Sequence, residues 1–264
     1  KMLFKERPLL MGFSNDLPES GDFITNEDTD IPIIITRNSE GKAKAFLNVC
    51  RHRGARLEDV PCGKKPRGFV CPYHAWKYDL DGKLIAIYGE DTFGKIDKSS
   101  HGLTELPVEE KYGMIYVRPT PGPALSIDDI LGDSLGPQLE TWDLGSMHLV
   151  DRQVFTMPTN WKLALDTFCE GYHFGPLHSE TIGDTTYSNI MTYDKYGYNH
   201  RVGFPNKTIL ELDKLPKQEW DSLYHFQFVY FLFPNVIILV SPDFINYFEL
   251  YPGKEVDNHL TRFS

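Results

Sequence analysis

The sequence contains the segment Cys-Arg-His at residues 50–52 and the segment Cys-Pro-Tyr-His at residues 71–74. Each segment offers one thiolate and one imidazole as ligands, and together they provide Cys50, His52, Cys71 and His74. Two Cys and two His can complete a tetrahedral zinc site or hold a two-iron cluster. A zinc finger pairs Cys with Cys and His with His along the chain, whereas each segment here mixes the two types. The mixed pattern favours a cluster in which one iron is bound by both sulfurs and the other by both imidazoles.

The composition limits the class of protein. The chain has 264 residues, a hydrophobic content of 41% and a formal net charge of −10. These values allow one large domain or two modest ones, and they argue against nucleic acid or an anionic membrane as partner. Four cysteines are too few for a disulfide scaffold. We interpret Cys62 and Cys169 as free thiols in a reducing compartment, which predicts a cytoplasmic protein.

The first part of the chain has the pattern of an antiparallel β domain. Between residues 13 and 84, short apolar and β-branched runs alternate with turns. One of these turns spans residues 79–83, where Gly82 can adopt a positive φ. Tight turns between short strands predict that the Cys- and His-containing segments at residues 50–52 and 71–74 lie at loop tips.

Three prolines and a glycine between residues 119 and 123 mark a linker. We therefore expect one domain at residues 1–120 and a second at residues 121–264. The most apolar run, residues 226–240, is broken by Pro234 and is shorter than the roughly 20 residues that a membrane helix needs. It predicts two strands around a bend.

A helix is expected directly after Asn160, which can cap a helix that begins at Trp161. We expect this helix to continue to about His173, because the Gly-Pro pair that follows must end it. On such a helix, Asp166 and Glu170 share one face with His173.

The Gly-Pro break can bring His178 back beside His173. Two imidazoles completed by one carboxylate would form a facial triad for non-haem iron(II), with open positions for O2. The alternative is a surface pair of histidines beside a helical salt-bridge face. Residues 180–200 are polar and predict a long loop. The histidines outside these motifs have no ligand-like spacing, although His200 or His225 could line a substrate pocket.

Together the two groups of motifs resemble the α subunits of Rieske non-haem iron oxygenases, also called aromatic-ring-hydroxylating oxygenases. The resemblance covers nearly the whole chain, through Asn48–Ala55, Cys71–Trp76, Asn160–Lys162, Glu170–His178 and Phe233–Asn235. It implies an α+β fold, with an antiparallel Rieske domain followed by a helix-grip (START-like) catalytic domain that has a curved antiparallel sheet. The C-terminal part of the catalytic domain is expected to be missing from this chain.

The resemblance also implies roles for particular residues. Cys50 and Cys71 would hold the inner iron of a [2Fe-2S] cluster, and His52 and His74 the outer iron. Likewise, His173 and His178 would bind a mononuclear Fe(II), whose third ligand, a carboxylate, is not in this chain. Glu170 occupies the place of the acid that connects the catalytic iron site to a cluster histidine of a neighbouring subunit, and electrons would cross there.

The function implied by the resemblance is that of a terminal oxygenase component, in enzyme class EC 1.14. Electrons from NAD(P)H would arrive through a flavin reductase, a ferredoxin or both, and the enzyme would use O2 to hydroxylate a small aromatic substrate. The family forms homotrimers (α3) or α3β3 assemblies and is typical of the bacterial cytoplasm.

Two alternatives stay open. Aspartate is commoner than glutamate at the position of Glu170, and Glu170 together with its surrounding motif resembles enzymes that act on carnitine-like quaternary amines. This alternative is a monooxygenase or oxidative demethylase acting on a quaternary amine or a methoxy substrate. The other, from a different class, is a Rieske electron-transfer protein without oxygenase activity.

Overall fold

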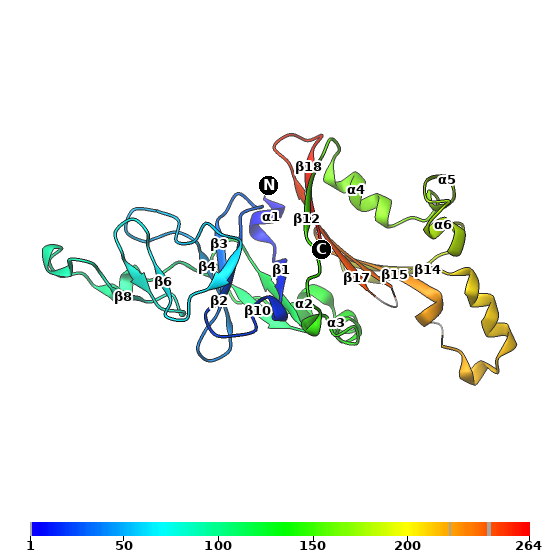
Figure 1. Cartoon of the computed structure of the whole chain (residues 1–264), viewed down its shortest axis with the longest axis horizontal. Helices are drawn as coiled ribbons and strands as arrows, with labels where there is room; N and C mark the ends of the chain where they lie inside the picture. The colour runs from blue at the N-terminus through cyan, green and yellow to red at the C-terminus, as the bar shows by residue number, and fades with distance from the viewer. Residues whose placement is uncertain (1, 222, 242–243) are drawn as a thin grey trace. The chain divides into compact units, whose positions relative to one another are not determined.

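The computed structural model describes residues 2–221, 223–241 and 244–264 and divides the chain into two compact units, Lys1–His148 and Leu149–Ser264 (Figure 1). The segment 121–148, which the proline-rich linker assigns to the second domain, packs with the first unit. Its helix α2 (Ile127–Leu131) is tied to that unit by Asp128, which accepts hydrogen bonds from Lys111 Nζ at 2.5 Å and Tyr112 Oη at 2.8 Å.

The first unit consists mainly of short antiparallel strands. In its described residues, the strand orders of the sheets are β1-β11-β10, β5-β2-β3-β4-β9 and β6-β7-β8. The strands are β1 (Leu9–Phe13), β2 (Asp22–Asn26), β3 (Ile33–Arg37), β4 (Ala43–Leu47), β5 (Cys62–Lys64), β6 (Phe69–Val70), β7 (Lys77–Tyr78), β8 (Leu84–Ala86), β9 (Glu105–Leu106), β10 (Val108–Lys111) and β11 (Met114–Val117). The helices are α1 (Leu3–Glu6), η1 (Ser14–Asp16), η2 (Glu90–Thr92), η3 (Lys98–His101), α2, α3 (Leu135–Glu140) and η4 (Leu144–Ser146).

The turn expected at residues 79–83 is present between β7 and β8. Asp79 N–H donates to the Lys83 carbonyl at 3.0 Å, and Gly82 has a φ of 77°. A Cβ atom on Gly82 would lie 2.5 Å from the ring of Phe46, so the turn needs glycine both for its φ and for its close approach to the core. The turn therefore fixes the β6-β7-β8 sheet against the core of the larger sheet.

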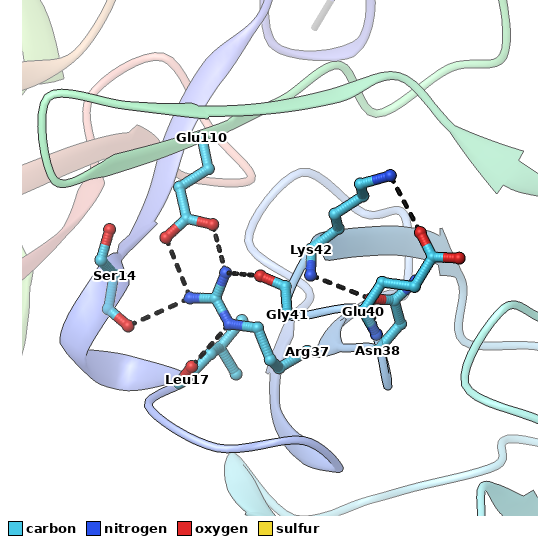
Figure 2. Close-up of polar contacts among 8 residues, drawn as sticks. All are labelled: Ser14, Leu17, Arg37, Asn38, Glu40, Gly41, Lys42 and Glu110. Atoms are coloured by element: carbon cyan, nitrogen blue, oxygen red, sulfur yellow. Dashed lines mark hydrogen bonds and ion pairs between the residues drawn. The ribbon is translucent and has the colours of Figure 1, made fainter.

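A buried arginine joins two sheets of the first unit (Figure 2). Arg37, at the end of β3, forms a two-pronged ion pair with Glu110 of β10, in which Nη2 donates to Oε1 at 2.9 Å. Its remaining N–H groups donate to the carbonyls of Leu17, Gly41 and Ser14. Burial opposes ionisation of Glu110, but the hydrogen bonds from Arg37 and Ser14 and the charge of Arg37 outweigh it and lower the Glu110 pKa.

The second unit is organised on one antiparallel sheet with the strand order β12-β18-β17-β16-β15-β14-β13. Its strands are β12 (Gln153–Met157), β13 (Thr192–Tyr196), β14 (Asn199–Pro205), β15 (Phe226–Leu232), β16 (Val236–Val240), β17 (Ile245–Pro252) and β18 (His259–Phe263). Its helices are α4 (Trp161–Phe168), α5 (Phe174–Leu177), α6 (Ile182–Thr185), η5 (Lys207–Lys214), η6 (Lys217–Glu219) and η7 (Leu223–His225). Residues of α4 and α5 pack on one face of the sheet, where Leu165 and Phe174 join a core with Val202, Phe204, Val229, Ile237 and Leu250.

Two expectations for this unit have different outcomes. The apolar run over residues 226–240 forms β15 and β16 around Pro234, as predicted. The expectation of a loop throughout 180–200 is wrong, because α6 and the β13–β14 hairpin occupy much of it. Thr192, Tyr193 and Tyr196 favour a strand, and Gly197, with a φ of 63°, permits the tight turn. Within the described residues, no helix has the length and apolar character to cross a bilayer.

Replacing Arg37 with Ala is expected to lower the free energy of unfolding by about 3 kcal/mol, because the half-buried Glu110 and three backbone carbonyls would lose their charged hydrogen-bond partner. Urea denaturation at pH 7 measures the effect. Lys42→Ala is the matched control, since Lys42 pairs with Glu40 on the surface, where their side chains are 70% and 67% exposed. Its unfolding midpoint should stay within experimental error of the wild type. Equal losses in the two variants would contradict the role of the buried pair.

Candidate metal centres

The two Cys-containing loops repeat the same backbone turn. In the first loop, Cys50 N–H donates to the Ala55 carbonyl at 2.8 Å, and Gly54 N–H donates to the Cys50 carbonyl at 3.0 Å. In the second loop, Cys71 makes equivalent bonds with the carbonyl five residues on and the amide four residues on, at 2.8 Å and 3.0 Å. The fourth residue after each cysteine has a positive φ, 73° at Gly54 and 54° at Ala75. Ala75 therefore holds a left-handed conformation that glycine would adopt with less strain.

The repeated turns bring the four ligand candidates together. The residues Cys50 and Cys71 are each only 2% exposed, and the ring centroids of His52 and His74 lie 4.7 Å apart. The Nδ1 atoms of both rings are buried and have no hydrogen-bond partner. Trp76 stacks on the His52 ring at 4.8 Å and thereby fixes its plane. Two buried thiols beside two unpaired imidazole nitrogens fit the donor set of a [2Fe-2S] cluster with Cys and His ligands.

A tyrosine behind the first loop contacts one of these thiols. Tyr78 Oη lies 3.3 Å from Cys50 Sγ and accepts the Arg51 N–H at 3.0 Å. Burial is the main cause that raises the pKa of Tyr78, so the phenol keeps its proton. Because the Arg51 amide already donates to Oη, the phenol proton can point at Cys50 Sγ. The same environment raises the pKa of Cys50, mainly through burial.

The electrostatics of His52 also suit a metal ligand. Burial is the largest cause that lowers its pKa, followed by the charges of His74 and Arg53. A lowered pKa keeps the imidazole neutral near pH 7, and only the neutral ring has a lone pair for a metal.

The second group of candidates lies where helix α4 ends. Asn160 caps α4, as predicted, by accepting Lys162 N–H at 3.0 Å. The expected continuation to His173 is wrong, because α4 ends at Phe168 and Glu170 lies beyond it. Gly171 follows, and a Cβ atom there would lie 2.9 Å from the ring of Phe204, so the chain leaves the helix to pack against β14.

The two remaining histidines flank a single helical turn. His173 precedes α5 and His178 follows it, with Leu177 N–H donating to the His173 carbonyl at 2.9 Å. The ring centroids of the two histidines are 5.3 Å apart. Pro176 was expected to break the chain here, but it lies inside the first turn of α5, where its missing N–H has no helical acceptor to lose. The helical turn, not a break, brings His178 back beside His173.

Glu170 contacts the first of these two histidines. Its Oε1 lies 2.5 Å from Nδ1 of His173, and its Oε2 accepts the backbone N–H of Tyr172 at 2.5 Å. Burial opposes ionisation of Glu170, but the bonds from His173 and Tyr172 outweigh it and lower the pKa of the carboxyl. A carboxylate that accepts the Nδ1 proton leaves the lone pair of His173 on Nε2, the atom available to a metal.

One sequence candidate does not join the site. Asp166 is exposed on α4, and the shared helical face expected for Asp166, Glu170 and His173 does not form, since only Asp166 lies on the helix. Over the ranges that the structure describes, no three Cys, His, Asp or Glu side chains surround one point as a complete metal site would require.

Two aromatic residues contact the candidate ligands of the first centre, although sequence reasoning assigned neither of them a role. Trp76 stacks on His52, and Tyr78 contacts Cys50. Both lie shortly after Cys71, and both are buried, at 3% and 0% exposure. Their alternation with Lys77 is the signal that could have placed their side chains on the core side of β7.

Comparison with known proteins gives two family matches along the chain. A profile described as the Rieske [2Fe-2S] domain matches residues 8–97, and one described as the ring hydroxylating alpha subunit (catalytic domain) matches residues 141–263. The first covers all four cluster candidates, and the second covers Glu170, His173 and His178.

The curated relatives include both a monooxygenase and a dioxygenase. The glycine betaine monooxygenase oxygenase subunit of Chromohalobacter salexigens is 33% identical over 192 residues, which are 73% of this chain and 41% of the relative. The α subunit of biphenyl 2,3-dioxygenase from Rhodococcus jostii is 33% identical over 178 residues, 66% of this chain and 38% of the relative. The chain thus spans about two fifths of the length of these relatives.

Solved structures share the fold over the whole chain. A quaternary ammonium Rieske monooxygenase in complex with L-carnitine matches with a TM-score of 0.83 and 23% identity, over 99% of this chain and 68% of the other. The α+β fold with a Rieske domain before the catalytic domain is therefore confirmed. The order of the two matched domains and the curated relatives show that this chain belongs to the α-subunit family of Rieske non-haem iron oxygenases.

Proposed function

We propose that this chain is part of a terminal oxygenase component that receives electrons from NAD(P)H through a separate reductase or ferredoxin and hydroxylates a small substrate with O2. The observation that carries the proposal is the pair of buried Nδ1 atoms without partners, on His52 and His74, beside two buried thiols. Two unpaired imidazole nitrogens next to two buried thiols make up the mixed Cys and His donor set that a Rieske cluster takes. In the cell, we place the protein in the bacterial cytoplasm, in keeping with its unpaired Cys62 and Cys169.

In this proposal, Cys50 and Cys71 hold the inner iron of the cluster, His52 and His74 hold the outer iron, and His173 and His178 hold the mononuclear iron. When bound, the cluster supplies one-electron transfer and the mononuclear iron supplies activation of O2. Because both thiols are buried, they would hold a cluster away from water on their side. The two imidazoles would hold its other side and could donate a hydrogen bond from their second ring nitrogen.

Glu170 contacts His173 and leaves part of its carboxylate exposed to a second partner. It holds the Nδ1 proton of His173, and its side chain is still 44% exposed. We propose that this exposed carboxylate also accepts a hydrogen bond from a cluster histidine of a neighbouring subunit, in a trimer of α subunits with or without β subunits. Glu170 would then join an imidazole ligand of the cluster to an imidazole ligand of the iron.

The substrate assigned by the family resemblance is an aromatic ring. A second candidate, monooxygenation of a quaternary amine, is favoured by the glutamate at position 170 and by relatives that include glycine betaine and carnitine monooxygenases. Both candidates use the same electron path and differ only in the molecule held near His173 and His178.

The full-length protein is expected to contain roughly three iron atoms per chain, two in the cluster and one at the mononuclear site. In the double variant His173→Ala/His178→Ala, the iron content should fall to about two, because only the mononuclear site loses its ligands. Iron analysis and the EPR spectrum of the reduced cluster measure this. A wild type with about two irons would identify a Rieske electron carrier instead, whereas three irons retained in the variant would show that the third iron is not held by His173 and His178.

Glu170→Gln is expected to slow electron transfer from the reduced cluster to the iron site by at least about tenfold, since an amide cannot hold the His173 proton as a carboxylate does. Single-turnover oxidation of the cluster, followed by absorbance with O2 and substrate present, gives the rate. Iron content and the cluster EPR signal should stay unchanged. Asp166→Asn, on the exposed side of α4, is the control and should keep the wild-type rate. A Glu170→Gln rate equal to this control would refute the connecting role.

Tyr78→Phe is expected to lower the reduction potential of the cluster by about 40 mV, the one-electron equivalent of a ~1 kcal/mol hydrogen bond. The reason is that a phenol proton directed at Cys50 Sγ stabilises the more negative, reduced cluster. Redox titration followed by EPR measures the potential. Tyr73→Phe serves as the control, because Tyr73 is 62% exposed and should leave the potential unchanged.

A further inference from the structure

The small sheet β6-β7-β8 has one buried face and one exposed face. Phe69 pairs with Tyr78 across β6 and β7, and both side chains are fully buried. Val70 pairs with Lys77 in the same two strands, so these side chains point to the opposite face. On this face Val70 is 49% exposed, and Ile85 of the neighbouring strand β8 is 43% exposed. Exposed apolar side chains therefore lie next to a lysine.

This exposed face begins directly beside the second cluster loop. Val70 precedes Cys71 in the chain, and Lys77 follows Trp76, whose ring stacks on His52 at 4.8 Å. Consecutive Cα atoms are about 3.8 Å apart. A protein docked on Val70 and Lys77 would thus be one peptide unit away from a candidate cluster thiol. Electron transfer between proteins requires such a short separation.

Cations surround the apolar side chains of this face. Lys77 lies on the face itself, while the exposed Arg67 and Lys83 precede β6 and β8. Within the described residues, no carboxylate forms an ion pair with any of these three cations. The two acids of the β7–β8 turn have other partners: Asp79 Oδ1 accepts two turn amides at 3.0 Å and 2.8 Å, and Asp81 Oδ1 accepts a side-chain amide at 2.8 Å. In a chain of net charge −10, this face is locally basic.

The proposed electron path leaves this face available to a second partner. In that path, the side of the loops that carries His52 and His74 contacts Glu170 of a neighbouring subunit. Oxygenation driven by NAD(P)H takes a pair of electrons, whereas a Rieske centre carries one electron at a time. The second electron must therefore arrive while the histidine side is covered. The electron donor needs another approach to the same loops, and the β6-β7-β8 face offers one.

We propose that Val70 and Lys77, with Arg67 and Lys83 at the rim, bind an acidic ferredoxin that delivers electrons to the cluster loops. This inference rests on the proposed oxygenase function and separates the entry of electrons from their exit. One electron passes from the reduced ferredoxin to the oxidised cluster, and no bond forms or breaks. The transfer is favourable because plant-type ferredoxins have lower reduction potentials than Rieske centres. A small apolar centre with a charged rim suits a transient redox complex.

Binding of a plant-type [2Fe-2S] ferredoxin tests the proposal. Calorimetry with the full-length, iron-loaded oxygenase measures the dissociation constant, and the affinity should fall as salt is added. Val70→Glu and Lys77→Glu should each weaken binding about tenfold or more, because each places a negative charge where carboxylates of the ferredoxin approach. Val150→Glu and Lys214→Glu, at exposed positions of the second unit, are the matched controls and should keep the wild-type affinity.

Cross-linking locates the contact independently. A water-soluble carbodiimide joins a lysine amine to a carboxylate where the two groups touch. Mass spectrometry should therefore find ferredoxin peptides joined to Lys77 or Lys83, and none joined to Lys214. Light scattering should give the same oligomeric state for every variant. A smaller assembly in Val70→Glu would show that this face lies between copies of the chain, and it would overturn the proposal.

The outcomes separate this inference from the proposed function. Wild-type affinity in Val70→Glu or Lys77→Glu, or cross-links confined to lysines outside this face, overturns the docking face. Circular dichroism and the cluster EPR signal of each variant, both expected at wild-type intensity, exclude misfolding as the cause of a loss. A wild type with intact cluster, about three irons and O2 uptake but no ferredoxin binding would refute only the docking face. The absence of a cluster or of the mononuclear iron would refute the oxygenase function itself.

Discussion

Two buried imidazole nitrogens without hydrogen bonds are the constraint on which the first unit depends. Leaving a buried polar atom unpaired costs about 1–3 kcal/mol, so Nδ1 of His52 and Nδ1 of His74 weaken the fold unless a bound group satisfies them. The protein holds them in place with two copies of the same turn. In the second copy of the turn, the backbone of Ala75 adopts a left-handed conformation. Such strain is typical of a site whose geometry is selected for a ligand, not for stability.

The rest of the first unit supports these turns. Phe46 packs on Gly82 and so fixes the β6-β7-β8 sheet, from which Trp76 and Tyr78 reach the two metal loops. Arg37 ties the larger sheet to β10 through Glu110. A small antiparallel unit has a limited core, and these specific contacts hold the two loops in register where hydrophobic burial alone would not.

In the second unit, ionisable groups come together at the end of a helix. Because α4 ends at Phe168, Glu170 lies outside the helix, and its carboxylate can turn toward His173. The single turn of α5 then sets the spacing of His173 and His178.

The sequence by itself determined the α+β class and the family and identified the candidate ligands, because the Cys-x-His, Cys-x-x-His and Glu-x-x-His segments are local patterns. The strands over residues 226–240 and the turn at Gly82 followed from local rules as well. Only the tertiary structure decided where α4 ends, because the contact of Gly171 with Phe204 involves β14, which lies far along the chain. It also decided that Tyr78 contacts Cys50 and that Trp76 stacks on His52. These depend on strand register and loop packing, and pairing between distant segments leaves no periodic signal in the sequence.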